Sequence, residues 1–271
     1  MTQQLPLEEV ITRLQQQDEI DGILLAGTTG KETLKPYSDY DLIIVLNDMP
    51  ITPSLIITTI EGYLAELYFL KASTLDEMLA NPTTVEANSL LGAFTSMTVR
   101  GEIVYDASGK LTQLRTIADD THYADILDHQ VYSSWYSVTY NHAQNLRYYH
   151  SQDPLYLDAL QCRLLYCVSN ALSAYFTLRR LPWRGEKEAI RYLRENDPSY
   201  WDVFQACVNA SGIHQQFERY TTLIEATLPD SMSIWGDDYT VIQPHAHLTE
   251  ESINQHQVIW KQWMNEKPSK N

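Results

Sequence analysis

The chain has 271 residues, enough for one large domain or two modest ones with a sizeable apolar core. Its 35 acidic side chains outnumber 19 basic ones, and the formal charge of −16 argues against binding to duplex nucleic acid or an anionic membrane, because phosphates would be repelled. A hydrophobic share of 44% and a charged share of 20% are typical of a globular protein and exclude whole-chain disorder.

The N-terminal sequence and the cysteines indicate a cytoplasmic protein. Residues 1–14, MTQQLPLEEVITRL, lack the basic and apolar regions of a secretory signal, and no apolar run reaches the roughly 20 residues that span a bilayer. Cys162, Cys167 and Cys207 are an odd number without CxxC spacing, so we predict neither a disulfide framework nor a zinc site. We expect them to be reduced thiols in the core.

Short apolar runs separated by turn residues predict a mixed α/β domain over residues 1–115. Apolar residues spaced i, i+3, i+4 and i+7 behind Pro6 predict a first helix over 6–19. Glu61-Gly62 is expected to close a hairpin, because glycine tolerates positive φ. The short apolar runs predict strands over 22–27, 41–46, 55–60, 63–70 and within 101–110. Short helices are expected over 74–80 and 86–92.

Helix-length segments dominate after residue 115, where all six tryptophans and 13 of the 18 tyrosines also lie. Prolines and glycines separate the predicted helices, which cover 111–150 (with an interruption), 155–180, 185–196, 199–210, 213–228 and 249–266. The predicted fold class is therefore α+β. A mixed-sheet domain, residues 1–115, precedes an all-α helical-bundle domain, residues 116–271.

The most informative segment is GTTGKETLKPYSDYDL, residues 27–42. Because side chains alternate along a strand, Asp39 and Asp41 project on the same side, about 7 Å apart. Two adjacent carboxylates repel one another unless a divalent cation neutralises them, and hard oxygen ligands with open positions favour Mg²⁺ holding a nucleoside triphosphate. A Walker P-loop is excluded, since Thr28 occupies the position of its lysine.

This segment resembles the DNA polymerase β-like nucleotidyltransferase superfamily, especially its small bacterial members that modify aminoglycoside or lincosamide antibiotics. The family pattern is Gly-Ser, roughly ten residues, then Asp-x-Asp. Here Gly27-Thr28 stands for Gly-Ser, and Asp39-Tyr40-Asp41 follows with Ser38 before it. Thr for Ser and Lys31 for the family's arginine are mild departures.

The resemblance implies a metal site. Asp39 and Asp41 would bind Mg²⁺, and a third carboxylate on a later strand would complete the site or deprotonate the acceptor hydroxyl. We choose Glu66 for this position. Glu61 is the competitor, but it precedes Gly62 in the predicted turn, where a side chain is more often solvated. The hydroxyl would attack the α-phosphorus in line, with pyrophosphate leaving on Mg²⁺.

Two segments are expected to bind the nucleotide. Gly27 would let the backbone approach phosphate oxygens, Thr28 would supply a hydroxyl and an amide, and Lys31 a positive charge. Residues 179–194 carry six basic and two acidic side chains, a local excess of +4, and Lys187, Arg191 and Arg194 recur at i, i+4 and i+7 on one helix face. The family resemblance implies a phosphate-binding lysine from the helical domain; Lys187 aligns with it, beside Arg191.

We predict a Mg²⁺-dependent enzyme that transfers a nucleoside monophosphate from ATP or another triphosphate to a hydroxyl of a small acceptor, such as an aminoglycoside-like antibiotic. One alternative is a toxin and antitoxin type of regulator that modifies a partner protein. Arg115 and His122 fit the Arg-to-His spacing of its helical partners, but their place at the domain junction makes the match a coincidence. Another alternative is a pseudoenzyme that binds nucleotide without turnover. The acceptor, the base and the oligomeric state stay open.

Histidines and tyrosines in the second half have simpler interpretations. His245, His247 and His256 lie near Asp237 and Asp238 in sequence, but no HExxH or spaced Cys/His set accompanies them, so a polar loop is favoured over a second metal site. The tyrosines are expected to pack between helices.

Overall fold

The computed structural model describes residues 5–26, 37–47, 49, 53–81, 89–120, 126–236 and 249–265. The chain forms two compact units, residues 1–125 and residues 126–271. Residue 115, the boundary expected from composition, lies inside helix α4 (Lys110–Asp120). Leu111 and Leu114 of this helix are fully buried in the core of the first unit, which therefore continues past the point where the aromatic content changes.

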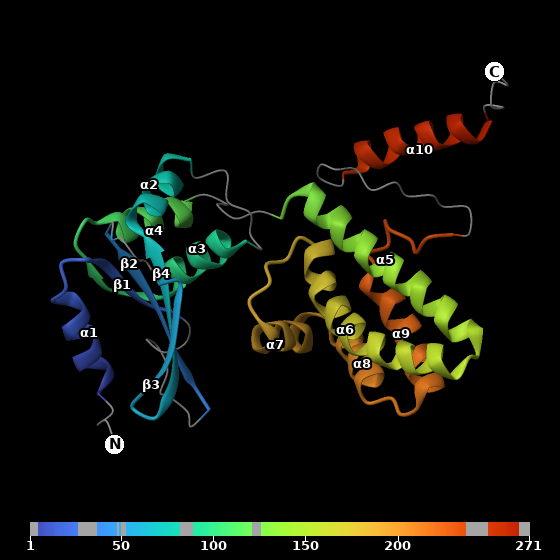
Figure 1. The fold of residues 1–271 in the computed structure, drawn as a ribbon, viewed down its shortest axis with the longest axis horizontal. Helices are drawn as coiled ribbons and strands as arrows, with labels where there is room; N and C mark the ends of the chain where they lie inside the picture. Colours follow the sequence, from blue (N-terminus) through green and yellow to red (C-terminus); the bar gives the residue numbers. More distant parts are fainter. Residues whose placement is uncertain are drawn as a thin grey trace. The chain divides into compact units, whose positions relative to one another are not determined.

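The first unit contains a five-stranded mixed sheet in the order β3-β4-β2-β1-β5 (Figure 1). Strands β2 and β4 are parallel, and the other neighbours are antiparallel. The predicted hairpin is confirmed: Glu61 and Gly62 join β3 to β4 with φ of 52° and 86°, as a tight two-residue turn requires. The strands are β1 (Ile20–Ala26), β2 (Asp39–Leu46), β3 (Leu55–Ile60), β4 (Tyr63–Lys71) and β5 (Glu102–Asp106).

Helices cover both faces of this sheet. Helix α1 (Leu7–Gln15), shorter than the predicted 6–19, packs its apolar stripe against the face that carries Tyr40, Leu42 and Ile44. Helices α2 (Ala72–Ala80), α3 (Leu90–Arg100) and α4 pack on the other face, which carries Ile43 and Val45. Alternate side chains of β2 thus pack in two different cores, one on each face of the sheet.

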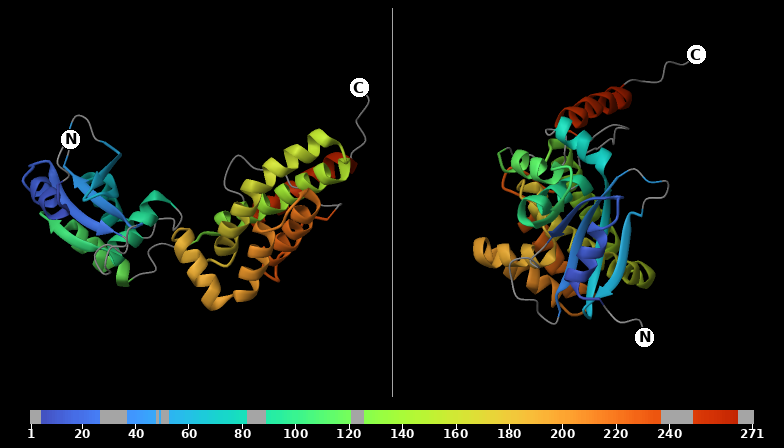
Figure 2. Two further views of the ribbon diagram at one scale, coloured as in Figure 1. Left: turned by 90° about the horizontal axis from the view of Figure 1, so that it is seen from below. Right: turned by 90° about the vertical axis from the view of Figure 1, so that its left-hand side faces the viewer.

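The second unit is helical, so the predicted α+β class is confirmed. Helices α5, α6, α8 and α9 pack together, and α7 lies against α8; Figure 2 shows the bundle from two further directions. The predicted helix 111–150 is interrupted, as expected, and forms α4 and α5. The helices are α5 (Asp128–Ser151), α6 (Pro154–Leu178), α7 (Glu186–Asn196), α8 (Pro198–Val208), α9 (Ile213–Thr227) and α10 (Glu250–Asn265).

The prediction of core thiols is confirmed for two of the three cysteines. Cys167 and Cys207 are buried free thiols, but Cys162 is exposed, so the expectation of three core thiols was wrong for that residue. Among the described helices, none is both long enough and apolar enough to cross a bilayer.

Candidate active site

The register of the sheet brings the predicted carboxylates to one face. Asp39 and Asp41 are half-buried and flank Tyr40, whose side chain is only 2% exposed on the opposite face. In the parallel ladder Asp41 pairs with Glu66, so the two residues lie side by side on neighbouring strands, whose backbones are about 4.8 Å apart. Asp39 lies two residues before Asp41 and points the same way.

This acidic group lies at one end of the face that α2, α3 and α4 cover. Farther along the same face, Ile43 and Val45 belong to the apolar core. On the other side of Asp41 its antiparallel partner is Ala26, the last residue of β1. Gly27, the first residue of the predicted phosphate-binding segment, follows Ala26 in sequence.

Several predicted nucleotide-binding residues fall in that segment. Gly27, Thr28 and Lys31 lie outside the described residues, and their roles stay predictions. Ser38 is described; it is half-buried and directly precedes β2. Ser38 is therefore adjacent to the acidic group.

A tyrosine that the sequence analysis did not select joins the carboxylates. The Tyr68 hydroxyl donates a hydrogen bond of 2.5 Å to Glu66 Oε2. This bond, burial, and the charges of Glu66, Asp41 and Asp39 raise the pKa of Tyr68 to about 12. The phenol therefore stays protonated at neutral pH and lies within the field of all three carboxylates. Period-two spacing from Glu66 would have placed Tyr68 on the same face.

The structure also separates Glu66 from its competitor. Glu61 lies in the β3–β4 turn and accepts a 2.7 Å hydrogen bond from the Tyr40 hydroxyl. Tyr40 belongs to the face that α1 covers, and burial together with this bond raises its pKa. Glu61 is thus held toward the opposite face, and the geometry favours Glu66 as the third carboxylate.

The donor set suits a hard divalent cation in its chemistry. Asp39, Asp41 and Glu66 offer carboxylate oxygens on one face of two neighbouring strands. Within the described part of the chain, no three His, Cys, Asp or Glu side chains are already gathered closely enough to hold a metal ion. Mg²⁺ usually takes one or two carboxylates and completes its shell with water and substrate phosphates, so a protein cage of three is not required.

Two arginines of the basic segment 179–194 hold parts of the helical unit together. Arg179 donates to the Thr227 and Ala226 carbonyls at the end of α9 and lies 3.8 Å above the Tyr175 ring. Arg180 bonds the Ile126 carbonyl and the Asp128 carboxylate. Two of the arginines counted in the local excess of +4 therefore have structural partners within the helical unit.

Of the remaining four cations, three lie along α7, and Arg184 precedes this helix. Lys187, Arg191 and Arg194 are exposed, as the predicted cationic face requires. Arg191, however, forms an ion pair with Glu188 at 2.8 Å, and the Arg194 guanidinium lies 5.1 Å from the Trp201 ring centre. The face is thus cationic but partly neutralised.

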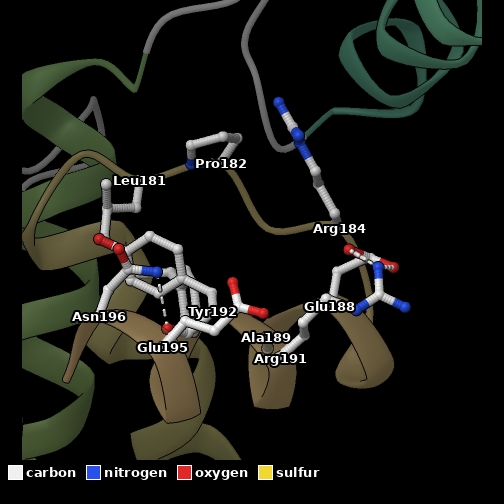
Figure 3. A pocket seen from close by; sticks show the side chains of 10 residues that line it. Leu181, Pro182, Arg184, Glu188, Ala189, Arg191, Tyr192, Glu195 and Asn196 are labelled. Carbon is white, nitrogen blue, oxygen red and sulfur yellow. Dashed lines mark hydrogen bonds and ion pairs between the residues drawn. The ribbon is translucent and has the colours of Figure 1, made fainter. Parts of the chain in front are cut away.

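A cavity of about 300 Å³ opens beside this helix (Figure 3). Phe176, Leu181 and Pro182 contribute apolar surface to it. Its charged lining comprises Arg184, Arg191, Glu188 and Glu195. Two cations and two anions balance one another, and Lys187 is not among the lining residues, so the cavity itself is not an anion site.

The residues set aside in the sequence analysis have structural roles where they are described. Arg115 donates to the Thr98 and Gly101 carbonyls inside the first unit. His122, His245 and His247 lie outside the described residues. The His256 ring bonds the Ser252 carbonyl within α10.

Comparison with known proteins adds a structural neighbour. No family model matches the sequence, and neither does any curated protein. Among solved structures, the chain is similar to a nucleotidyltransferase-like protein from Exiguobacterium sibiricum 255-15, with 12% identity, coverage of 81% of this chain and 72% of that one, and a TM-score of 0.41. At this identity and TM-score, the likeness supports no assignment of roles to residues. The residue roles proposed for this chain depend on its own geometry.

Proposed function

We propose that this protein is a Mg²⁺-dependent nucleotidyltransferase that moves a nucleoside monophosphate from ATP to a hydroxyl of a small acceptor. The observation that carries the proposal is the in-register pair of Asp41 and Glu66, with Asp39 on the same face at the start of β2. Like-charged carboxylates this close are costly unless a cation joins them. The pair also lies beside the end of β1, where the Gly27-Thr28 segment begins.

In this proposal Asp39, Asp41 and Glu66 hold the cation. When bound, Mg²⁺ neutralises the triphosphate and favours departure of pyrophosphate. The acceptor oxygen forms a bond to the α-phosphorus as the bond to the bridging oxygen breaks. The hydroxyl proton passes to a carboxylate of this group, and catalysis otherwise consists of positioning and charge stabilisation.

Nucleotide binding is proposed for two groups of residues. Gly27, Thr28, Lys31 and Ser38 are proposed to bind phosphate oxygens through amide, hydroxyl and ammonium groups. Lys187 and Arg191 are proposed to add positive charge, supported by their exposure on α7. The net charge of −16 favours a cationic acceptor such as an aminoglycoside.

The experiment uses the full chain, Mg²⁺, α-labelled ATP and a panel of aminoglycosides and lincosamides. Labelled acceptor and one pyrophosphate per acceptor are expected, and Asp39→Asn should abolish both. Asp76→Asn is the matched control, since Asp76 is an exposed aspartate that pairs with Lys110 on the surface. Absence of transfer with every triphosphate and acceptor, or transfer that survives Asp39→Asn, would contradict the proposal.

A further inference from the structure

Tyr68 is fixed to the sheet from several sides. It lies on β4, paired with Ile43 of β2 and with Leu55 of β3. Its ring packs against the core under α2, α3 and α4, next to Leu70 on the same strand face. A ring held in this way has little freedom to follow a neighbouring side chain.

The hydroxyl of this ring lies at the border between the apolar core and the acidic group. It donates to Glu66 Oε2 at 2.5 Å, which leaves the second oxygen of Glu66 available for another partner. Glutamate has three side-chain torsions and loses rotamer entropy when it becomes ordered. The anchored phenol therefore orders the flexible carboxylate, and not the reverse.

We propose that Tyr68 is a positioning residue that holds the Glu66 carboxylate beside Asp41, so that this pair presents its oxygens to a divalent cation in a fixed arrangement. The inference rests on the proposed function, because it takes Glu66 as a metal-facing group. Hydrogen bonds to metal-binding carboxylates orient them, and their loss typically lowers metal affinity by about 10-fold to 100-fold. Tyr68 itself stays a neutral donor and touches neither metal nor substrate.

The other face of the sheet supplies a matched control. The Tyr40 hydroxyl donates to Glu61 Oε2 at 2.7 Å, which is the same chemical pair in the same sheet. Tyr40 and Glu61 lie on the α1 side, away from Asp39 and Asp41. Tyr68→Phe and Tyr40→Phe thus each remove one oxygen and one tyrosine–glutamate bond, but only the first affects the acidic group.

The test measures Mn²⁺ binding to the full chain without nucleotide, by the electron paramagnetic resonance signal of free Mn²⁺, for wild type, Tyr68→Phe, Tyr40→Phe and Asp41→Asn. Tyr68→Phe is expected to weaken binding by about 10-fold, with a melting temperature no lower than that of Tyr40→Phe. Tyr40→Phe should leave Mn²⁺ affinity unchanged, and Asp41→Asn should abolish specific binding. In a Glu66→Gln background, Tyr68→Phe should cause no additional loss, because the bond it removes has no charged acceptor.

Different outcomes test the role of Tyr68 and the metal site itself. Unchanged or tighter Mn²⁺ binding in Tyr68→Phe, while Asp41→Asn still abolishes it, would overturn the role of Tyr68 and leave the metal site intact. An equal loss from Tyr68→Phe in both the wild-type and Glu66→Gln backgrounds would also overturn it, because the effect would not act through Glu66. Absence of saturable binding in wild type, or binding that survives Asp41→Asn, would overturn the metal site of the proposed function and the inference with it.

Discussion

Carboxylates in the sheet and in the helical unit differ in their charged neighbours. Asp39, Asp41 and Glu66 have one another as neighbours on one sheet face. Asp197, which precedes α8, is instead surrounded by donors: it accepts from the Tyr175 hydroxyl at 2.7 Å, from Ser199 and from the Tyr200 amide, and Arg179 is nearby. The difference separates two uses of an acidic side chain. A single carboxylate that several donors surround stabilises the fold, whereas carboxylates grouped on one face favour a cation.

The largest expected effect concerns the choice between two glutamates. Glu66→Gln should lower kcat/KM about 100-fold, the size typical for loss of one electrostatic group at an active site. Glu61→Gln should stay near the wild-type rate, because its carboxylate faces Tyr40 on the other side of the sheet. Rates of pyrophosphate release measure both. The reverse ranking would assign the third carboxylate to the turn.

Substitution of an aspartate should affect stability differently in the two regions. Asp197→Ala deletes an N-cap and the partner of Tyr175, and should lower the free energy of unfolding by about 2 kcal/mol. Asp41→Asn relieves the repulsion between Asp41 and Glu66, so it should cost less stability than Asp197→Ala. Urea unfolding of the two variants checks this contrast, and equal losses would contradict it.

The exposed face of α7 tests the nucleotide assignment. Lys187→Ala and Arg191→Ala should each raise KM for ATP about tenfold, with kcat little changed, because a charge-assisted phosphate contact contributes about 1.5 kcal/mol or more. Arg194→Ala is the matched control, since its guanidinium lies over Trp201 on the same exposed face. A response of all three, or of Arg194 alone, would move the phosphate contact elsewhere.

The smallest expected effect is a difference in acid sensitivity. Burial would raise the pKa of Asp197, but the bonds from Tyr175, Ser199 and the Tyr200 amide, with Arg179, outweigh it and lower the pKa below the ordinary 3.8. The unfolded chain therefore binds the proton first, and this stabilisation is lost as pH falls below that value.

Asp197→Asn keeps an oxygen acceptor for the Tyr200 amide but cannot titrate. Its unfolding free energy should therefore fall less steeply below pH 4 than that of wild type, as followed by circular dichroism of acid titrations. Asp202→Asn, an exposed change on the same helix, should retain the wild-type slope. Parallel slopes for wild type and Asp197→Asn would exclude a contribution of Asp197.

Most of the fold could be predicted from local patterns. Short apolar runs separated by turn residues indicated the strands, and prolines such as Pro154 and Pro198, which occupy the first turns of α6 and α8, indicated where helices begin. The change in aromatic content predicts a domain boundary at residue 115, which lies inside α4. The first unit includes this helix, because Leu111 and Leu114 pack in its core.

The candidate site could be predicted only in part. The spacing of Asp39 and Asp41 is local, so sequence could place both on one face. The pairing of Glu66 with Asp41, and the bond from Tyr68, depend on the register between β2 and β4, which are far apart in sequence. Sequence likewise could not show that Arg179 and Arg180 bind backbone carbonyls of residues far away in the sequence.

The two-residue turn at Glu61 and Gly62 has a consequence for how this protein can change length during evolution. The turn fixes the register of β3 with β4, and Glu66 follows it after a set number of residues. One residue inserted or deleted between Gly62 and Glu66 would rotate Glu66 to the face of Tyr40 and move it away from Asp41. Proteins with this site are therefore expected to vary in length outside this short stretch and to keep its length constant.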